Sequence, residues 1–377
     1  MRVALVRQRY NPYGGAERFI ERALPALERA GVELTLISRR AEGWGARRFL
    51  AVDPFHVGNT WRDASFAAAA RAAWEAGGFD LVQSHERIAG CDIYRAGDGV
   101  HAEWLEIRRA ASGTAFWSPE RLGIALNPYH HYVCAAERRL FTHPRLRAVV
   151  CNSAMVRGEI ERRFGVAPEK LHVIHNGVDL EYFHPARRAA LRSAARAQLG
   201  LGARAFLFLF VGSGFWRKGL DAAIGALAGC GEANLHLAVA GRDRDVARFA
   251  AQAQAAGLGG RVHLLGGRDD VRPLYAAADC FLLPTRYDPF PNTALEALAM
   301  GLPVIVGRRS GAAEIVQPGN GWICDPGDVA GLARLLREAV AASGDNRLLG
   351  AARGAAEGYG IDDMARRLTQ LYSELGR

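Results

Sequence analysis

Short apolar runs alternate with longer helix-forming stretches along the 377-residue chain, in two successive blocks. Such runs stand at 2–6, 33–37, 81–84 and 148–152 in the first block, and at 206–211, 235–240, 262–265, 280–283 and 303–306 in the second. Strand-length runs that alternate with helices are typical of parallel sheets. The pattern predicts an α/β fold of two doubly wound, Rossmann-like domains, and the chain length also favours two domains.

The two blocks meet around 173–179, where Asn176-Gly177 favours a turn. We therefore assign residues 1–168 to the first domain and 169–361 to the second. Gly360 is expected to break the last helical region. Ligands of doubly wound sheets bind at the carboxyl ends of the strands, so two facing domains would leave a binding cleft between them.

One helix start in the second block has the chemistry of a nucleotide-sugar site. Residues 288–301 read D-P-F-P-N-T-A-L-E-A-L-A-M-G, and the two prolines place the helix start at Asn292 or Thr293. The free N–H groups and positive dipole end of such a helix can hold a diphosphate. Asp288 can accept hydrogen bonds from sugar hydroxyls, and Glu296 from a ribose diol. The alternative is that Asp288 is a turn residue and Glu296 a solvated helix residue.

Two glycine-rich loops follow predicted strands and are candidate phosphate sites. The first contains Gly14 and Gly15, and the second, 212–219, reads G-S-G-F-W-R-K-G. Small residues in such loops let backbone N–H groups approach an anion. Neither loop fits a dinucleotide or P-loop motif, because Arg217 stands at the third glycine position and Leu220 follows the second loop.

These segments resemble the family 4 retaining glycosyltransferases with the GT-B fold. Residues 288–296 match their E-x7-E signature, with Asp288 in place of the first Glu, and 301–316 resemble the strand and loop that continue it. The resemblance implies that Arg217 and Lys218 grip the donor diphosphate. It also implies a final helix at 362–377 that packs back on the first domain.

Residues 92–104, D-I-Y-R-A-G-D-G-V-H-A-E-W, resemble the acceptor-side segment of lipopolysaccharide inner-core glucosyltransferases. Asp98 stands at the position of their functional aspartate, and Glu103 also matches. An Asp between two glycines is also common in ordinary turns.

Residue chemistry and resemblance together give a set of candidate site residues. The catalytic candidates are Asp98, Arg217, Lys218 and Asp288. The donor-binding candidates also include Gly14, Gly15, Gly212, Gly267, Arg268, Phe290, Pro291, Asn292, Thr293 and Glu296. The acceptor-binding candidates are Arg18, His85, Glu103 and Trp104.

A metal site is not expected. Asp243-Arg-Asp245 has the form of a D-x-D metal clamp, but it follows a strand ending at Gly241, where acids commonly cap a helix. Arg217 and Lys218 already supply the positive charge that a metal would bring. We expect no cofactor beyond the nucleotide-sugar itself.

The formal charge of +9 indicates an acidic partner, although arginine richness also follows from a codon-biased genome. From Trp104 to Arg147, aromatic residues and cations interleave, which suits an anionic membrane surface. An ordinary helix pair with a wet face is the alternative. Nucleic acid ranks last, because no recognition motif accompanies the charge.

The cellular setting follows from three absences in the sequence. There is no apolar run near the roughly 20 residues that span a bilayer, and the segment 1–6 is expected to be a strand rather than a signal peptide. The six cysteines show no C-x-x-C spacing, which favours free thiols in a reducing compartment. We expect a cytoplasmic protein, peripheral on the cytoplasmic face of the inner membrane.

The sequence thus predicts a metal-independent, retaining hexosyltransferase. Its donor would be a UDP-hexose such as UDP-glucose, and its acceptor a lipopolysaccharide inner core or related glycolipid. Three alternatives remain: a GT-B nucleotide-sugar epimerase, an inverting transferase with His85 or Asp98 as base, and a catalytically inactive sugar-binding protein.

Overall fold

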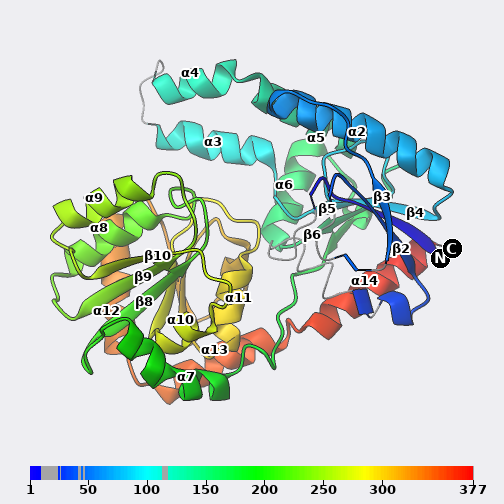
Figure 1. Ribbon diagram of the computed structural model, residues 1–377. Helices are drawn as coiled ribbons and strands as arrows, with labels where there is room; N and C mark the ends of the chain where they lie inside the picture. The colour runs from blue at the N-terminus through cyan, green and yellow to red at the C-terminus, as the bar shows by residue number, and fades with distance from the viewer. Residues whose placement is uncertain (10–23, 26, 41–43, 46, 113–117, 377) are drawn as a thin grey trace. The chain divides into compact units, whose positions relative to one another are not determined.

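The computed structural model describes residues 1–9, 24, 25, 27–40, 44, 45, 47–112 and 118–376. The chain divides into two α/β units (Figure 1). Unit 1 comprises Met1–Gly177 and Ile361–Arg377, and unit 2 comprises Val178–Gly360. The division falls at Gly177 rather than at 168, because β7 (Leu171–Val173) pairs with β6 (Ala148–Cys151) and so belongs to the first sheet.

Unit 1 is built on a seven-stranded sheet in which all neighbouring strands are parallel, in the order β3-β2-β1-β4-β5-β6-β7. Apolar runs correctly placed β1 (Arg2–Val6), β2 (Glu33–Ser38), β4 (Leu81–Ser84) and β6. The sequence analysis missed β7, the exposed edge strand β3 (Arg48–Ala51) and β5 (Ile93–Ala96), which carries the buried Arg95.

Side chains alternate between the two faces of this sheet, and each face has its own apolar core. Val3 and Leu5 of β1 share a cluster with residues of α14 (Ile361–Leu375). Ala4 and Val6 share another with residues of α2 (Gly58–Gly77), α5 (Pro128–Phe141) and α6 (Ala154–Phe164). Helix α14 therefore completes unit 1, although it lies beyond unit 2 in the sequence (Figure 1). Two further helices of this unit are α3 (His101–Ala111) and α4 (Pro119–Leu126).

Unit 2 is built on a six-stranded parallel sheet in the order β10-β9-β8-β11-β12-β13, around one continuous core. Its strands are β8 (Phe206–Val211), β9 (Leu235–Ala240), β10 (Val262–Gly266), β11 (Cys280–Leu283), β12 (Val304–Gly307) and β13 (Gly321–Cys324). Its helices are α7 (Pro185–Gln198), α8 (Leu220–Cys230), α9 (Val246–Ala255), α10 (Arg272–Ala277), α11 (Asn292–Ala299), α12 (Val329–Ala341) and α13 (Asn346–Glu357).

The strand order reverses once in each sheet, between β1 and β4 in unit 1 and between β8 and β11 in unit 2. At such a switch point the loops leaving the two strands run to opposite faces and leave a crevice at the carboxyl edge, where ligands of doubly wound sheets bind. Each unit therefore has one edge position at which a site is expected.

A row of arginines on α7 caps the end of α10. Arg192 Nη1 donates hydrogen bonds to the carbonyl oxygens of residues 276, 277 and 278, at 3.0, 3.0 and 2.8 Å. Arg196, one turn later, donates to the carbonyl oxygen of residue 277, and both guanidinium groups pair with Asp279. The Asp279 carboxylate also accepts the N–H of Leu207 at 2.8 Å. These bonds satisfy carbonyls that a helix end leaves without intrahelical partners, and they tie α7 and α10 to β8.

We expect Arg192→Ala to lower the free energy of unfolding by about 2 kcal/mol, because it removes hydrogen bonds from a charged donor to partly buried acceptors. Arg187→Ala, on the exposed side of the same helix, should cost less than about 1 kcal/mol. Urea unfolding followed by circular dichroism measures both. An equal loss in the free energy of unfolding for the two variants would show that the hydrogen bonds of Arg192 to α10 do not stabilise the fold.

Candidate active sites at the carboxyl edges of the two sheets

In unit 2, the loop after β8 is locked against the loop after β11. Gly219 has φ +80°, and a Cβ there would stand 2.0 Å from the carbonyl oxygen of Pro284, so only glycine fits. The carbonyl oxygen of Arg217 accepts the N–H of Arg286 at 2.8 Å and the hydroxyl of Thr285 at 3.0 Å. The two switch-point loops are thus one fixed surface.

Lys218 and Asp288 form an ion pair on this surface. Lys218 Nζ lies 2.5 Å from Asp288 Oδ2, and the two side chains are only 11% and 8% exposed. The Asp288 backbone is held as well, because its N–H donates to Arg309 and its carbonyl oxygen accepts from Gly311. The sequence analysis gave these two residues separate tasks, whereas the structure joins them directly.

Arg217 lies along the same loop, with its guanidinium 3.3 Å from the carbonyl oxygen of Tyr287. The neighbouring Gly212 is packed tightly, since a Cβ at Gly241 would stand 2.1 Å from the Gly212 carbonyl oxygen. Gly267 and Arg268 are both exposed just beyond β10.

Asp243 is held by backbone donors of the glycine-rich loop and of its own segment. The Asp243 carboxylate accepts the N–H of Phe215 at 2.6 Å and that of Asp245 at 2.8 Å, so it holds the glycine-rich loop in place. Asp245 precedes α9 as its N-cap residue, without a side-chain cap bond. No group of three or more His, Cys, Asp or Glu side chains among the described residues is arranged to hold a metal ion.

Helix α11 begins at Asn292, as predicted, with Pro291 as its cap residue. Pro291 gives this helix start no side-chain cap bond. Glu296, in the second turn, is buried, and its Oε2 accepts the Tyr275 hydroxyl at 3.1 Å. Phe290 is also buried, 6.4 Å from the ring of Tyr359. Glu296 is therefore not a solvated helix residue, and Asp288 is not a solvated turn residue.

In unit 1, a cavity of about 420 Å³ opens beside the carboxyl ends of β1 and β4. It is lined by Arg7, Gln8, Arg9, Arg62, Asp63, Phe66, Ala67, Glu86, Arg87, Ile88, Asp98, Tyr129, Tyr132, Val133 and Ala136. Charged and polar side chains share the walls with apolar side chains of α2 and α5 and with Ile88, which follows β4. This composition suits a polyhydroxyl ligand, which needs donors, acceptors and a ring-sized apolar surface.

Arg7 stands between two carboxylates on one side of the cavity. Its Nη1 lies 3.5 Å from Glu86 Oε1 and 3.8 Å from Asp98 Oδ2. Burial raises the pKa of Glu86, while the Arg7 charge and the N–H of Gln8, at 2.9 Å, act against that rise. The Asp98 side chain is 55% exposed. The sequence analysis missed Arg7 and Glu86, although both follow predicted strands next to the switch point.

The other side is built around Asp63 of α2. Its carboxylate accepts hydrogen bonds from Gln8 Nε2 at 3.0 Å, Arg62 Nε at 2.7 Å and the Tyr129 hydroxyl at 3.0 Å. Burial and the Asp63 charge raise the pKa of Tyr129 to about 12, so this hydroxyl keeps its proton at neutral pH. The two sides of the cavity are thus linked through Gln8.

His85 belongs to a buried chain of hydrogen bonds that reaches α14. The Tyr372 hydroxyl donates to Gln83 Oε1 at 2.8 Å, and Gln83 Nε2 lies 2.9 Å from His85 Nε2. Because the amide oxygen takes the tyrosine proton, the amide nitrogen donates to His85, whose Nε2 is then an acceptor. Burial lowers the pKa of His85 well below its usual value. This arrangement disfavours an inverting mechanism in which His85 Nε2 is the base.

The structure does not bring the other acceptor-side candidates to this cavity. Glu103 is buried in α3 and pairs with Arg162 at 2.8 Å and Arg163 at 3.1 Å, both on α6. Trp104, beside it on α3, is not among the lining residues. A fixed helix–helix ion pair therefore explains Glu103 without a ligand. Gly14, Gly15 and Arg18 lie outside the described residues.

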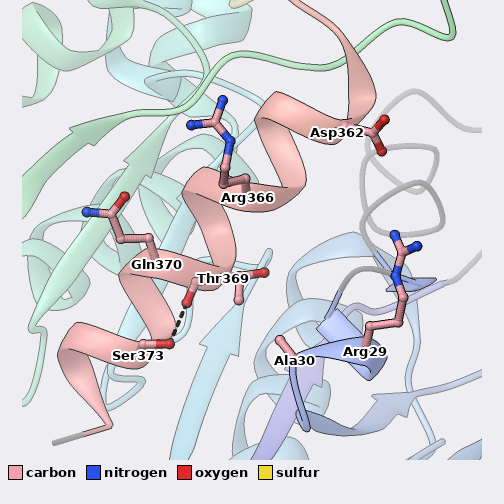
Figure 2. Close-up of a pocket in the computed structure, with 7 residues that line it drawn as sticks. All are labelled: Arg29, Ala30, Asp362, Arg366, Thr369, Gln370 and Ser373. Carbon is pink, nitrogen blue, oxygen red and sulfur yellow. Dashed lines mark hydrogen bonds between the residues drawn. The ribbon is translucent and has the colours of Figure 1, made fainter.

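A second hollow of about 690 Å³ lies between α14 and residues 29–30 (Figure 2). Arg29 and Arg366 border it from the two sides, but the hydroxyls of Thr369 and Ser373 donate to carbonyls of their own helix. Residues 29–30 precede β2, so the hollow is at the amino end of that strand. Doubly wound sheets bind ligands at the opposite edge.

Two family models match successive parts of the chain. The family model "Glycosyltransferase Family 4" matches residues 13–182, and "Glycosyl transferases group 1" matches residues 192–351. A probable transglycosylase of Burkholderia thailandensis is 30% identical over 332 residues, which cover 87% of this chain and 83% of that protein. The chain belongs to the family 4 glycosyltransferases. The two family models correspond to the two α/β units.

Within this family, the lipopolysaccharide glucosyltransferase WaaG of Escherichia coli (strain K12) is 28% identical over 350 residues, covering 91% of this chain and 90% of WaaG. A crystal structure of WaaG, a glycosyltransferase involved in lipopolysaccharide biosynthesis, matches with a TM-score of 0.81 and 26% identity, covering 98% of this chain and 99% of that one. Anabaena Alr3699/HepE in complex with UDP-glucose shares the fold, with a TM-score of 0.74 and 22% identity over 99% of this chain and 100% of that one. The fold is GT-B.

The Lys218–Asp288 contact has a measurable energetic signature. Lys218→Met should lower the free energy of unfolding by about 3 kcal/mol, because it leaves a buried carboxylate without its cation. The double variant Lys218→Met/Asp288→Asn should be destabilised by at least about 1 kcal/mol less than the sum of the two single variants. Urea unfolding of the four proteins gives the coupling. Purely additive costs would mean that the pair is not formed in solution.

Proposed function

We propose that the protein is a retaining, metal-independent hexosyltransferase that uses a UDP-sugar and glycosylates a lipopolysaccharide inner core or a related glycolipid. The observation that carries this proposal is the convergence of Lys218, Asp288 and the start of α11 at the switch point of unit 2. The similarity to WaaG supports the acceptor class. The fold shared with a UDP-glucose complex supports the donor class.

The donor diphosphate would bind at Lys218, Arg217 and the backbone N–H groups of Asn292 and Thr293. Cations and oriented N–H groups at this position stabilise the charge that develops on a departing diphosphate, and such preorganised electrostatics commonly supply the largest share of catalysis. When the diphosphate binds Lys218, the ion pair between Lys218 and Asp288 would weaken. The Asp288 carboxylate can then accept hydrogen bonds from sugar hydroxyls, which couples phosphate binding to sugar orientation.

The acceptor sugar would bind in the cavity of unit 1, where Asp98 is the most accessible carboxylate beside Arg7. Asp98 would orient the acceptor hydroxyl, and Glu86 would hold Arg7 in place from the buried side. No protein nucleophile takes part in this proposal. A leaving phosphate oxygen takes the hydroxyl proton on the same face of the sugar, so the anomeric configuration is kept.

Access to a lipid-anchored acceptor requires contact with a membrane surface. No helix in the described part of the chain is both long and apolar enough to cross a bilayer. The basic stretch Trp104–Arg147 would supply electrostatic attraction to anionic headgroups. Within it, Arg108 pairs with Glu120 at 3.1 Å, whereas Arg109, Arg138 and Arg139 are exposed. The protein would thus work on the cytoplasmic leaflet of the inner membrane.

Transfer from UDP-glucose to purified inner-core acceptor tests the function itself. We expect at least about half of the activity to remain in excess EDTA, because Arg217, Lys218 and the α11 start replace a divalent cation. Product NMR should show an α-linkage, the configuration of the donor. A β-linked product would contradict the retaining mechanism. Complete loss of activity in EDTA, restored by Mg²⁺ or Mn²⁺, would contradict metal independence.

The two acids should respond differently to neutral replacements. Glu296→Gln should weaken UDP binding about tenfold, or about 1.4 kcal/mol, because its proposed partner is the ribose. Asp288→Asn should not weaken UDP binding, because its partners are Lys218 and the sugar, but should slow transfer on the order of a hundredfold. Calorimetry with UDP and initial rates separate the two effects. If Glu296→Gln binds UDP like the parent, the ribose role is wrong.

A further inference from the structure

Three apolar side chains of unit 1 are exposed to solvent and lie, in the sequence, just before residues that line its cavity. We call this cavity, where the acceptor is proposed to bind, the acceptor cavity. Phe55 is 74% exposed, Val57 66% and Trp61 50%. They lie in the turn before α2 and in its first residues, and the rings of Phe55 and Trp61 meet edge to face, 5.4 Å apart. We call residues 55–61 the apolar turn. The sequence analysis assigned this segment no role.

A buried arginine holds the apolar turn in place from the inside. Arg39 Nη1 donates to Asp53 Oδ1 at 2.6 Å and to the carbonyl oxygen of Pro54 at 2.9 Å. Its Nη2 donates to the carbonyl oxygen of Arg62 at 2.7 Å, and the guanidinium lies over the Phe66 ring, 5.4 Å from its centroid. Residues on both sides of the apolar turn are therefore tied to one buried cation. These bonds fix the backbone on both sides of the segment that carries the exposed side chains.

The apolar turn is continuous with the acceptor cavity. Arg62, Asp63 and Phe66, which follow Trp61 on the first turns of α2, all line that cavity. Tyr129, which donates a hydrogen bond to Asp63, also follows an exposed apolar residue in the sequence. Leu126, at the end of α4, is 70% exposed and lies shortly before Tyr129 of α5 in the chain. Exposed apolar residues thus precede both Asp63 and Tyr129, which line the cavity.

Charge and area indicate which occupant covers this surface. Two ion pairs border the apolar turn, Arg39 with Asp53 and Arg62 with Asp63, and Arg40 adds a positive charge near Asp53. A large aromatic side chain presents roughly 150–250 Å², so the three exposed side chains together offer on the order of 400 Å². A stable dimer buries about 800 Å² on each partner. Exposed Trp and Phe side chains instead suit the boundary between lipid headgroups and acyl chains.

We propose that Phe55, Val57 and Trp61 insert into the lipid layer that carries the acceptor, so that the acceptor's sugar head enters the cavity directly from the membrane surface. This proposal rests on the proposed function for the identity of the acceptor. Insertion is hydrophobic and should persist at high salt, whereas attraction by the basic stretch is screened. The two contributions can therefore be separated.

The experiment measures binding to vesicles of phosphatidylcholine with phosphatidylglycerol, at low salt and at about 0.5 M salt. At the higher salt concentration the screening length is on the order of 4 Å, so attraction between exposed charges is largely removed. The test variant is Phe55→Ser/Val57→Ser/Trp61→Ser. The matched control, Val246→Ser/Ile323→Ser/Val329→Ser, removes three exposed apolar side chains of unit 2. A third variant, Arg108→Gln/Arg109→Gln/Arg121→Gln, weakens the basic stretch. UDP affinity of every variant, measured by calorimetry, shows whether unit 2 is intact.

We expect the test variant to lose at least about tenfold in vesicle affinity at high salt, about 1.4 kcal/mol, while the control stays within about twofold. The arginine variant should lose affinity mainly at low salt. Brominated lipids should quench the tryptophan fluorescence of the parent, and Trp61→Phe should remove much of that quenching. The test variant should still glycosylate a delipidated core oligosaccharide at the parent rate but act poorly on acceptor embedded in vesicles.

Equal vesicle binding by the test variant and the parent would overturn the proposal. A concentration-dependent dimer of the parent that the same substitutions abolish would overturn it too, since a second copy would then be the occupant. If the parent transfers sugar to neither form of the acceptor, the proposed function fails, but the vesicle and quenching results still decide whether the apolar turn inserts.

Discussion

The ion pair between Lys218 and Asp288 joins the two loops that unit 2 leaves side by side where its strand order reverses. It depends on a glycine at 219, because any larger residue would collide with the carbonyl oxygen of Pro284. It also depends on the backbone bonds that hold Asp288 to the segment 309–311. A cation held at this spot by a carboxylate can exchange that partner for a phosphate without moving far. In the proposed function, this exchange would give one physical cause for both diphosphate binding and sugar orientation.

Unit 1 repeats the plan with different chemistry. Here too the functional groups follow the two strands at the reversal, with Arg7 after β1 and Glu86 after β4. Arg7 is shared between a partly buried carboxylate and a more accessible one, so Asp98 is kept close to a positive charge while half of its side chain stays exposed. Both sites therefore pair a cation with an acid. In the proposed function the first would hold a diphosphate, beside the start of α11, and the second the acceptor sugar.

Apolar runs were enough to predict most of the strands, because a buried parallel strand is apolar on both faces. They failed at β3, whose residues are all exposed, and at β5, where Arg95 interrupts the pattern. Motif resemblance located Lys218 and Asp288 but could not show their contact, which joins residues 70 positions apart. It also placed Glu103 with the acceptor residues, whereas Arg162 and Arg163 hold that carboxylate within a helix–helix contact. Spacing in the sequence does not reveal which charges neutralise each other in three dimensions.

The most direct test of this account is the affinity of Lys218→Met for UDP and for uridine, compared with the parent by calorimetry. If Lys218 exchanges its carboxylate partner for the donor diphosphate, UDP should bind at least about tenfold more weakly, or about 1.4 kcal/mol, while uridine affinity stays the same. Unchanged UDP binding, or an equal loss for UDP and uridine, would contradict the account.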